Sequence, residues 1–120
     1  MATAHQKIAV VVVLAALVGT MATGYAAYRG SNVARLRPIV WAMSALLLLQ
    51  AALGIALAAG GNRPMDGLHF VYGPLLLFSL PVALLIARGR SQRDAGIVLT
   101  LGWLVTLVLS LRAVGTGGFG

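Results

Sequence analysis

Four long apolar stretches alternate with short polar segments along this chain of 120 residues. The stretches have 18 to 22 residues each and cover residues 8–28, 38–59, 68–87 and 97–114. Because a helix rises about 1.5 Å per residue, about 20 helical residues cross the roughly 30 Å hydrocarbon core of a bilayer. The one charged side chain within the stretches is Arg112, near the end of the fourth. The pattern predicts an all-α membrane protein, with four transmembrane helices forming a single domain over residues 1–120.

Composition supports this interpretation and narrows the chemistry. Hydrophobic residues make up 60% of the chain and charged residues 9%, and the net charge is +7. Most of the positive residues lie in two short loops, so we expect them to contact anionic lipid and not nucleic acid. The absence of cysteine excludes disulfides and thiol catalysis. Two carboxylates and two histidines leave little for acid–base catalysis, and the chain is not predicted to be an enzyme.

The distribution of Lys and Arg predicts the orientation of the helices. Loops 29–37 and 88–93 contain three arginines each, whereas Lys7, Arg63 and Arg112 are spread over the opposite side. Since Lys and Arg favour the cytoplasmic side, we expect both Arg-rich loops in the cytoplasm and both termini outside. The first stretch is predicted to be a retained helix, and the short loops predict an up-down-up-down bundle.

Small residues indicate where the helices approach one another, because close backbone contact drives helix association in lipid. Such stripes are predicted at Ala15, Gly19, Ala22 and Ala26, at Gln50, Gly54 and Ala58, and at Gly102, Thr106 and Ser110. The third helix differs, since Pro74 and Pro81 each free a carbonyl that neighbouring helices must satisfy.

The predicted outer rim collects most of the remaining polar chemistry. It contains His5, Arg63, Asp66, His69 and Arg112. We expect Asp66 to lie near Arg112 or Arg63. Arg112 either binds an anionic group, such as a haem propionate, or extends to the lipid headgroups.

His69 is the candidate metal ligand. On a helix it shares a face with Tyr72 and Gly73, which would give an imidazole for haem iron and a gap for the flat ring. The alternative is a histidine that caps the helix. A second axial ligand would have to come from His5, expected in a flexible tail, from Met65, or from His69 of another protomer.

Gln50 lies at mid-membrane, where an amide is expected to face protein. It either binds a quinone carbonyl or forms an interhelical hydrogen bond with Ser79 or Thr106.

Three segments carry a family resemblance: Leu49-Gln50-Ala51-Ala52-Leu53-Gly54, Leu68-His69-Phe70-Val71-Tyr72-Gly73 and Leu111-Arg112-Ala113-Val114-Gly115-Thr116-Gly117. Together they resemble a family of small uncharacterised bacterial four-helix membrane proteins. The pattern is also similar to one four-helix half of heme A synthase, although that family carries histidines on its second and fourth helices and this chain has His69 on the third. The resemblance implies a location in the bacterial inner membrane and a bundle of respiratory-chain type.

Three functions follow as hypotheses. The first is a non-enzymatic accessory subunit or assembly partner of a larger, energy-transducing membrane complex. The second is a haem- or quinone-binding redox protein that uses His69, and the third is a small transporter or channel. A Soret band in the visible absorption spectrum would favour the second over the first.

The orientation is testable by cysteine labelling, because the chain has no cysteine of its own. Single cysteines at Ser31 and Ser91 should resist an impermeant thiol reagent in intact cells, and one at Asn62 should react. The reverse labelling pattern would contradict the predicted topology.

Overall fold

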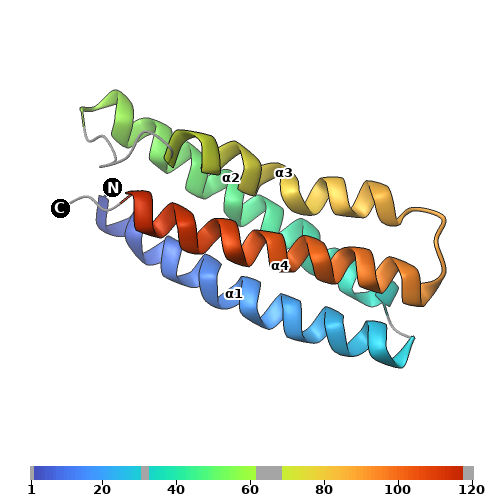
Figure 1. Ribbon diagram of the computed structural model, residues 1–120. Helices are drawn as coiled ribbons and strands as arrows, with labels where there is room; N and C mark the ends of the chain where they lie inside the picture. The colour runs from blue at the N-terminus through green and yellow to red at the C-terminus, as the bar shows by residue number, and fades with distance from the viewer. Residues whose placement is uncertain (1, 31–32, 62–68, 118–120) are drawn as a thin grey trace.

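The computed structural model describes residues 2–30, 33–61 and 69–117 (Figure 1). The elements are α1 (Ala2–Arg29), the short 3-10 helix η1 (Val33–Leu36), α2 (Arg37–Ala59), α3 (His69–Ala87) and α4 (Gln92–Gly117). Each α-helix contains a segment of 18 to 27 residues that is long and apolar enough to cross a membrane. The particle is 47 Å long, close to the full thickness of a bilayer with its headgroups. The prediction of an all-α, multi-pass membrane protein with four helices is confirmed.

Neighbouring helices run in opposite directions, as the short loops predict. The two chain ends lie together at one end of the bundle in Figure 1, here called the terminal end. The turn after α1 and the turn between α3 and α4 lie at the other end. That second end, the Arg-rich end, contains Arg29, Arg35, Arg37, Arg88, Arg90 and Arg93. The up-down-up-down arrangement is therefore confirmed.

The first helix begins earlier than the apolar stretch predicts. Helix α1 starts at Ala2, so the expectation that His5 lies in a flexible tail is wrong. The polar residues Gln6 and Lys7 are good helix formers, and no glycine or proline precedes Ile8. A helix can thus extend past the hydrocarbon boundary that ended the prediction at residue 8.

The fourth helix also begins earlier, at Gln92 instead of residue 97. Ser91 caps it, because the Ser91 hydroxyl accepts a hydrogen bond of 3.2 Å from the Asp94 backbone N–H. The Asp94 carboxylate lies in the first turn, where the helix dipole favours a negative charge. The sequence signal is the Ser-x-x-Asp spacing at residues 91–94.

Helix α4 is the central element of the bundle, packed against both α1 and α3. The Trp103 side chain is almost fully buried and lies directly over Gly19 of α1, where any Cβ atom would overlap the indole ring. On the α3 side, a Cβ atom at Gly102 would lie 2.6 Å from the Cβ of Ala83. Both glycines are therefore required for close approach of the helices.

The small-residue stripes mark the interfaces with one adjustment. Gly102, Thr106 and Ser110 of α4 are all buried, as predicted. On α1, Gly19 and Ala26 are buried but Ala22 is exposed. The buried face of α1 runs instead through Val12, Ala16, Gly19, Thr23 and Ala26. The observed interface is therefore rotated slightly from the predicted stripe, with Gly19 and Ala26 common to both.

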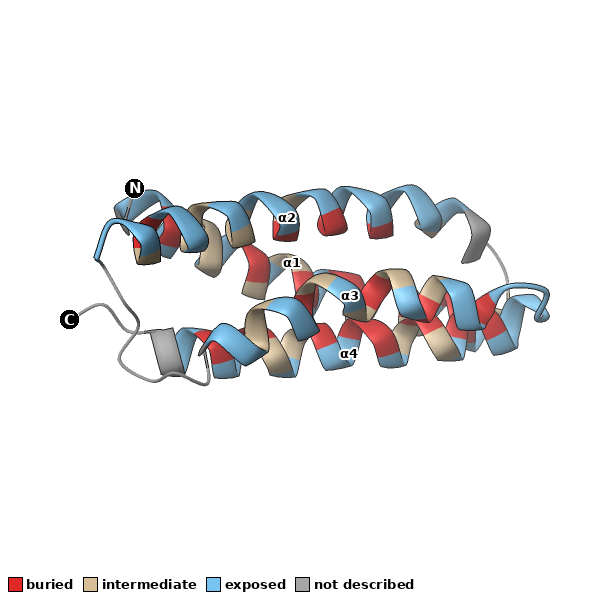
Figure 2. Cartoon of the chain, turned by 90° about the horizontal axis from the view of Figure 1, so that it is seen from above, coloured by how far each residue is buried: buried red, intermediate tan, exposed pale blue. Residues whose placement is uncertain are grey.

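Large apolar side chains cover the outside of the bundle. Figure 2 shows the buried residues facing inward between the helices and the exposed ones along the outer surfaces. Val18, Phe78 and Val108 are each more than half exposed. An exterior of this kind is stable in contact with lipid chains and would aggregate in water.

We expect the Gly102→Ala substitution to destabilise the bundle by about 1–3 kcal/mol, the usual range for overpacking. The matched control is Gly115→Ala in the same helix, because no atom lies within 4 Å of the added Cβ there. The control should be neutral or slightly stabilising, since alanine favours helix over glycine by roughly 0.5–1 kcal/mol. Reversible unfolding in detergent gives the free energy of unfolding of both variants. Equal effects of the two variants would contradict the close α3–α4 contact.

Candidate functional site

The predicted rim residues that the structure describes do not converge on one cavity. Arg112 is exposed on α4, and Tyr72 is half-buried and packs against the core. Gly73 is half-buried, with open space where a Cβ would be. Arg63 and Asp66 lie outside the described residues, as does the side chain of His69. The haem site at His69 and the pairing of Asp66 with an arginine stay predictions.

A metal site built from several protein ligands is not found in the described part of the chain. No group of three or more His, Cys, Asp or Glu side chains comes together within residues 2–30, 33–61 and 69–117. His5, one of the two histidines, is buried in α1 and packs against α2.

The contact of His5 with α2 joins the first two helices near the terminal end. The Gln50 side-chain amide donates a hydrogen bond of 2.8 Å to the backbone carbonyl of His5. One turn further along α2, a Cβ atom at Gly54 would lie 3.1 Å from Cε1 of the His5 ring. The imidazole therefore occupies the gap that Gly54 leaves. Gln50 thus forms an interhelical hydrogen bond, although neither Ser79 nor Thr106 is its partner.

Ser79 and Thr106 bond to each other instead. Their hydroxyl oxygens lie 2.8 Å apart and connect α3 to α4. The Thr106 hydroxyl also donates to the Gly102 carbonyl of its own helix. Such bonds satisfy polar groups that have no access to water within the membrane.

The remaining buried polar side chains of the described residues are small. Ser44 and Ser110 donate to carbonyls of their own helices. Apart from His5, the buried polar side chains are all hydroxyls, at Thr23, Ser44, Thr106 and Ser110. Ser44, Thr106 and Ser110 are each satisfied by a carbonyl of their own helix.

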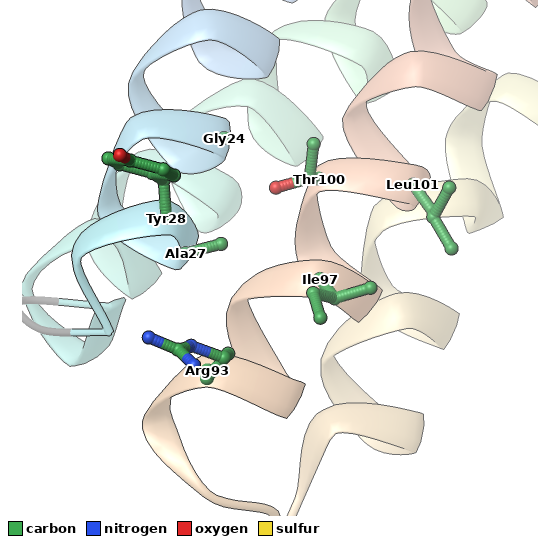
Figure 3. Close-up of a pocket in the computed structure, with 7 residues that line it drawn as sticks. All are labelled: Gly24, Ala27, Tyr28, Arg93, Ile97, Thr100 and Leu101. Carbon is green, nitrogen blue, oxygen red and sulfur yellow. The ribbon is translucent and has the colours of Figure 1, made fainter.

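Two grooves open on the surface at the Arg-rich end. The first lies between α1 and α4 and has a volume of about 510 Å³. Figure 3 shows its lining, which is Gly24, Ala27 and Tyr28 of α1 with Arg93, Ile97, Thr100 and Leu101 of α4. The second lies between α2 and α3, has a volume of about 250 Å³, and is lined by Arg37, Trp41, Pro81, Leu84, Leu85 and Arg88. Both combine arginine and an aromatic ring with apolar walls.

The sequence analysis did not identify these grooves. A usable signal exists, since Tyr28, Trp41 and the arginines lie within one turn of the predicted membrane boundary. An aromatic ring and a cation at that depth are typical of lipid-headgroup contacts. Which arginine shares a groove with which aromatic ring depends on the packing of α1 against α4 and of α2 against α3.

Comparisons of the chain with family models, with curated proteins and with solved structures found no match.

We expect His5 and Gly54 to behave as a coupled pair. Gly54→Leu should push the His5 ring away from α2 and lower the stability of the bundle. Adding His5→Ala should restore part of that loss, because the space of the imidazole becomes free for the leucine. Unfolding of the two single variants and the double variant gives the coupling free energy, expected within about 0.5–3 kcal/mol for contacting residues. Strictly additive effects would contradict the contact.

Proposed function

We propose that this protein is a non-enzymatic subunit of a larger membrane complex and that it binds a helix of another subunit through the outward face of α2. The observation that carries the proposal is a row of small residues on that face. Ala42, Ala45, Ala52, Ala56 and Ala59 are all exposed, and the larger Leu49 lies between Ala45 and Ala52 in the same row. In lipid, such a surface lets another helix approach closely.

The spacing of the row fits a helix–helix seam. Its members follow one another at steps of three and four residues, which is the heptad spacing of left-handed helix packing. The inward face of α2, which contains the buried Val40, Met43, Leu47 and Leu57, lies on the opposite side of the helix. The alanine row is therefore not used within this bundle.

Large side chains border the row. Trp41, Leu48 and Ile55 lie along one side at seven-residue intervals, and each is more than half exposed. Leu46 and Leu53 lie along the other side and are half-buried. Between these larger side chains, the alanines on either side of Leu49 leave space into which the side chains of a second helix can insert.

Among the described residues, the outward faces of the other three helices carry isolated small residues, such as Ala22, but no such row. Most of their exposed positions within the apolar stretches are occupied by large residues, for example Leu14 and Val18 on α1, Phe78 on α3, and Val105 and Val108 on α4. These surfaces match lipid chains, whereas the outward face of α2 leaves space that lipid chains fill poorly. The contrast supports α2 as the site of contact with a partner subunit.

The interior of the bundle supports a structural role over transport. Its buried polar side chains, as described above, are hydroxyls and one histidine held between α1 and α2. Ion pathways through membranes are usually marked by ionisable side chains in the interior. The resemblance to heme A synthase supports a respiratory complex as the host, in the bacterial inner membrane.

The proposal is tested by enlarging the alanine row. We expect Ala52→Phe to release the chain from its complex, because the ring fills the space that the alanines leave. The control is Val105→Phe, which adds a ring to the outward face of α4 and should leave the complex intact. The measurement is the mass of the complex after mild detergent extraction from the native membrane, compared with the 12.4 kDa chain. Circular dichroism checks that both variants remain helical.

Cysteine cross-linking identifies the occupant of the row. Ala45→Cys and Ala52→Cys should form adducts with one and the same membrane protein, and Val105→Cys should not. An adduct of two copies of this chain, or an unchanged complex in Ala52→Phe, would contradict the proposal. A Soret band in the purified chain that is lost in His69→Ala would instead establish the haem-binding alternative.

A further inference from the structure

The groove between α1 and α4 at the Arg-rich end has a charge and shape that the subunit role does not explain. Its walls are mainly apolar, and its mouth carries the Arg93 guanidinium (Figure 3). A Cβ atom at Gly30 would lie 3.6 Å from one Arg93 nitrogen, which places that side chain of α4 beside the end of α1. Arg93 thus crosses the mouth of the groove from one helix to the other.

Within the described residues, Arg93 has no protein partner for its charge. Two other arginines of this end are engaged: Arg90 donates to the Ile86 carbonyl, and Arg29 donates to the Tyr25 hydroxyl and lies over that ring. Arg93 forms no hydrogen bond or ion pair of this kind in the described part of the chain. Six arginines and one carboxylate, that of Asp94, give this end an excess of positive charge. The guanidinium is available for an anion from outside the protein.

The groove continues from the charged mouth toward the hydrocarbon. Ile97 lies one turn beyond Arg93, and Leu101 lies two turns beyond it, a rise of about 12 Å along α4. On the α1 side, Gly24 lines the groove, and a Cβ atom there would be in van der Waals contact with the Thr100 methyl at 3.6 Å. The exposed Tyr28 ring lies at the level of Gly24 and Thr100 in Figure 3, further along the groove than Arg93. A cation at the mouth, followed by apolar walls with an aromatic ring beside them, matches a phosphate followed by an acyl chain.

We propose that the α1–α4 groove binds a phospholipid with an anionic headgroup. The Arg93 guanidinium donates to the phosphate, and one acyl chain lies along Ile97 and Leu101 beside Gly24. Basic pockets between transmembrane helices are typical sites for such lipids. A free phosphate ion would contact only the Arg93 end of the groove and would leave its apolar walls uncovered. A phospholipid has both a phosphate and an acyl chain, so we favour a lipid as the source of the anion.

The α2–α3 groove repeats the same combination. Arg37 and Arg88 approach from two helices, with Trp41 as the aromatic ring and Pro81 and Leu84 in the walls. Within the described residues, neither arginine side chain forms a hydrogen bond or ion pair. We expect the α2–α3 groove to bind the same class of lipid more weakly than the α1–α4 groove, because its volume is about half as large.

The experiment measures lipid retention by the purified full chain. The protein in detergent is titrated with dioleoyl phosphatidylglycerol or dioleoyl phosphatidylcholine, and bound lipids are counted by native mass spectrometry. We expect Arg93→Gln to weaken phosphatidylglycerol binding roughly fivefold, the factor that corresponds to about 1 kcal/mol for one arginine near an anionic surface. The matched control is Arg90→Gln, which removes the same charge from the same end and should change binding less than twofold.

A second variant tests the acyl-chain part of the site. Gly24→Leu fills the channel and should weaken binding of both lipids while the Arg93 charge remains. Equal losses in Arg93→Gln and Arg90→Gln would show a diffuse surface charge and overturn the site. So would equal retention of the two lipids by the unaltered chain, or displacement of the bound lipid by millimolar inorganic phosphate. Because these variants leave the outward face of α2 intact, the result is independent of the subunit role.

Discussion

Within a bilayer, apolar side chains gain little by leaving lipid for protein, so helices associate where their surfaces touch closely. In this bundle the closest contacts involve α4. The indole of Trp103 lies on Gly19 of α1, and Gly102 receives Ala83 of α3. The hydroxyl pair of Ser79 and Thr106 adds a polar bond beside the second contact. These contacts set the distances between α1, α4 and α3, and thereby the groove that opens between α1 and α4.

The second helix relates differently to the rest. It is joined to α1 by two contacts of His5. The Gln50 amide donates a hydrogen bond to the His5 carbonyl, and the His5 ring packs against Gly54. Its inward face carries larger residues than its outward face, the reverse of α1 and α4, whose glycines face inward. Small residues on the outward face of a helix are expected where that face packs against a partner subunit.

Sequence reasoning predicted the features that depend on local pattern. The four helices and their alternating directions follow from the length of the apolar stretches and the short loops. The buried row of Gly102, Thr106 and Ser110 was also predicted correctly. On α1 the prediction chose Ala22, whereas Thr23 is buried. Both residues are small, and residue size alone does not decide which of two adjacent positions faces the neighbouring helix. The contact of His5 with Gly54 was not predicted, because the predicted helix began where the apolar stretch begins, at residue 8. Backbone hydrogen bonding continues the helix beyond that point, so His5 lies within α1. The grooves required knowledge of which helices are neighbours, which no local pattern contains.

The central position of α4 has a consequence for how the chain assembles. The three preceding helices enter the membrane before the element that joins α1 to α3 has been synthesised. Until then, Gly19 and Ala83 face lipid or another protein and lack their native contacts. The early bundle is therefore held mainly through α2, and its packing becomes complete only when Trp103 and Gly102 arrive. The close contacts of α1 and α3 with α4 therefore form after α1, α2 and α3 have been synthesised.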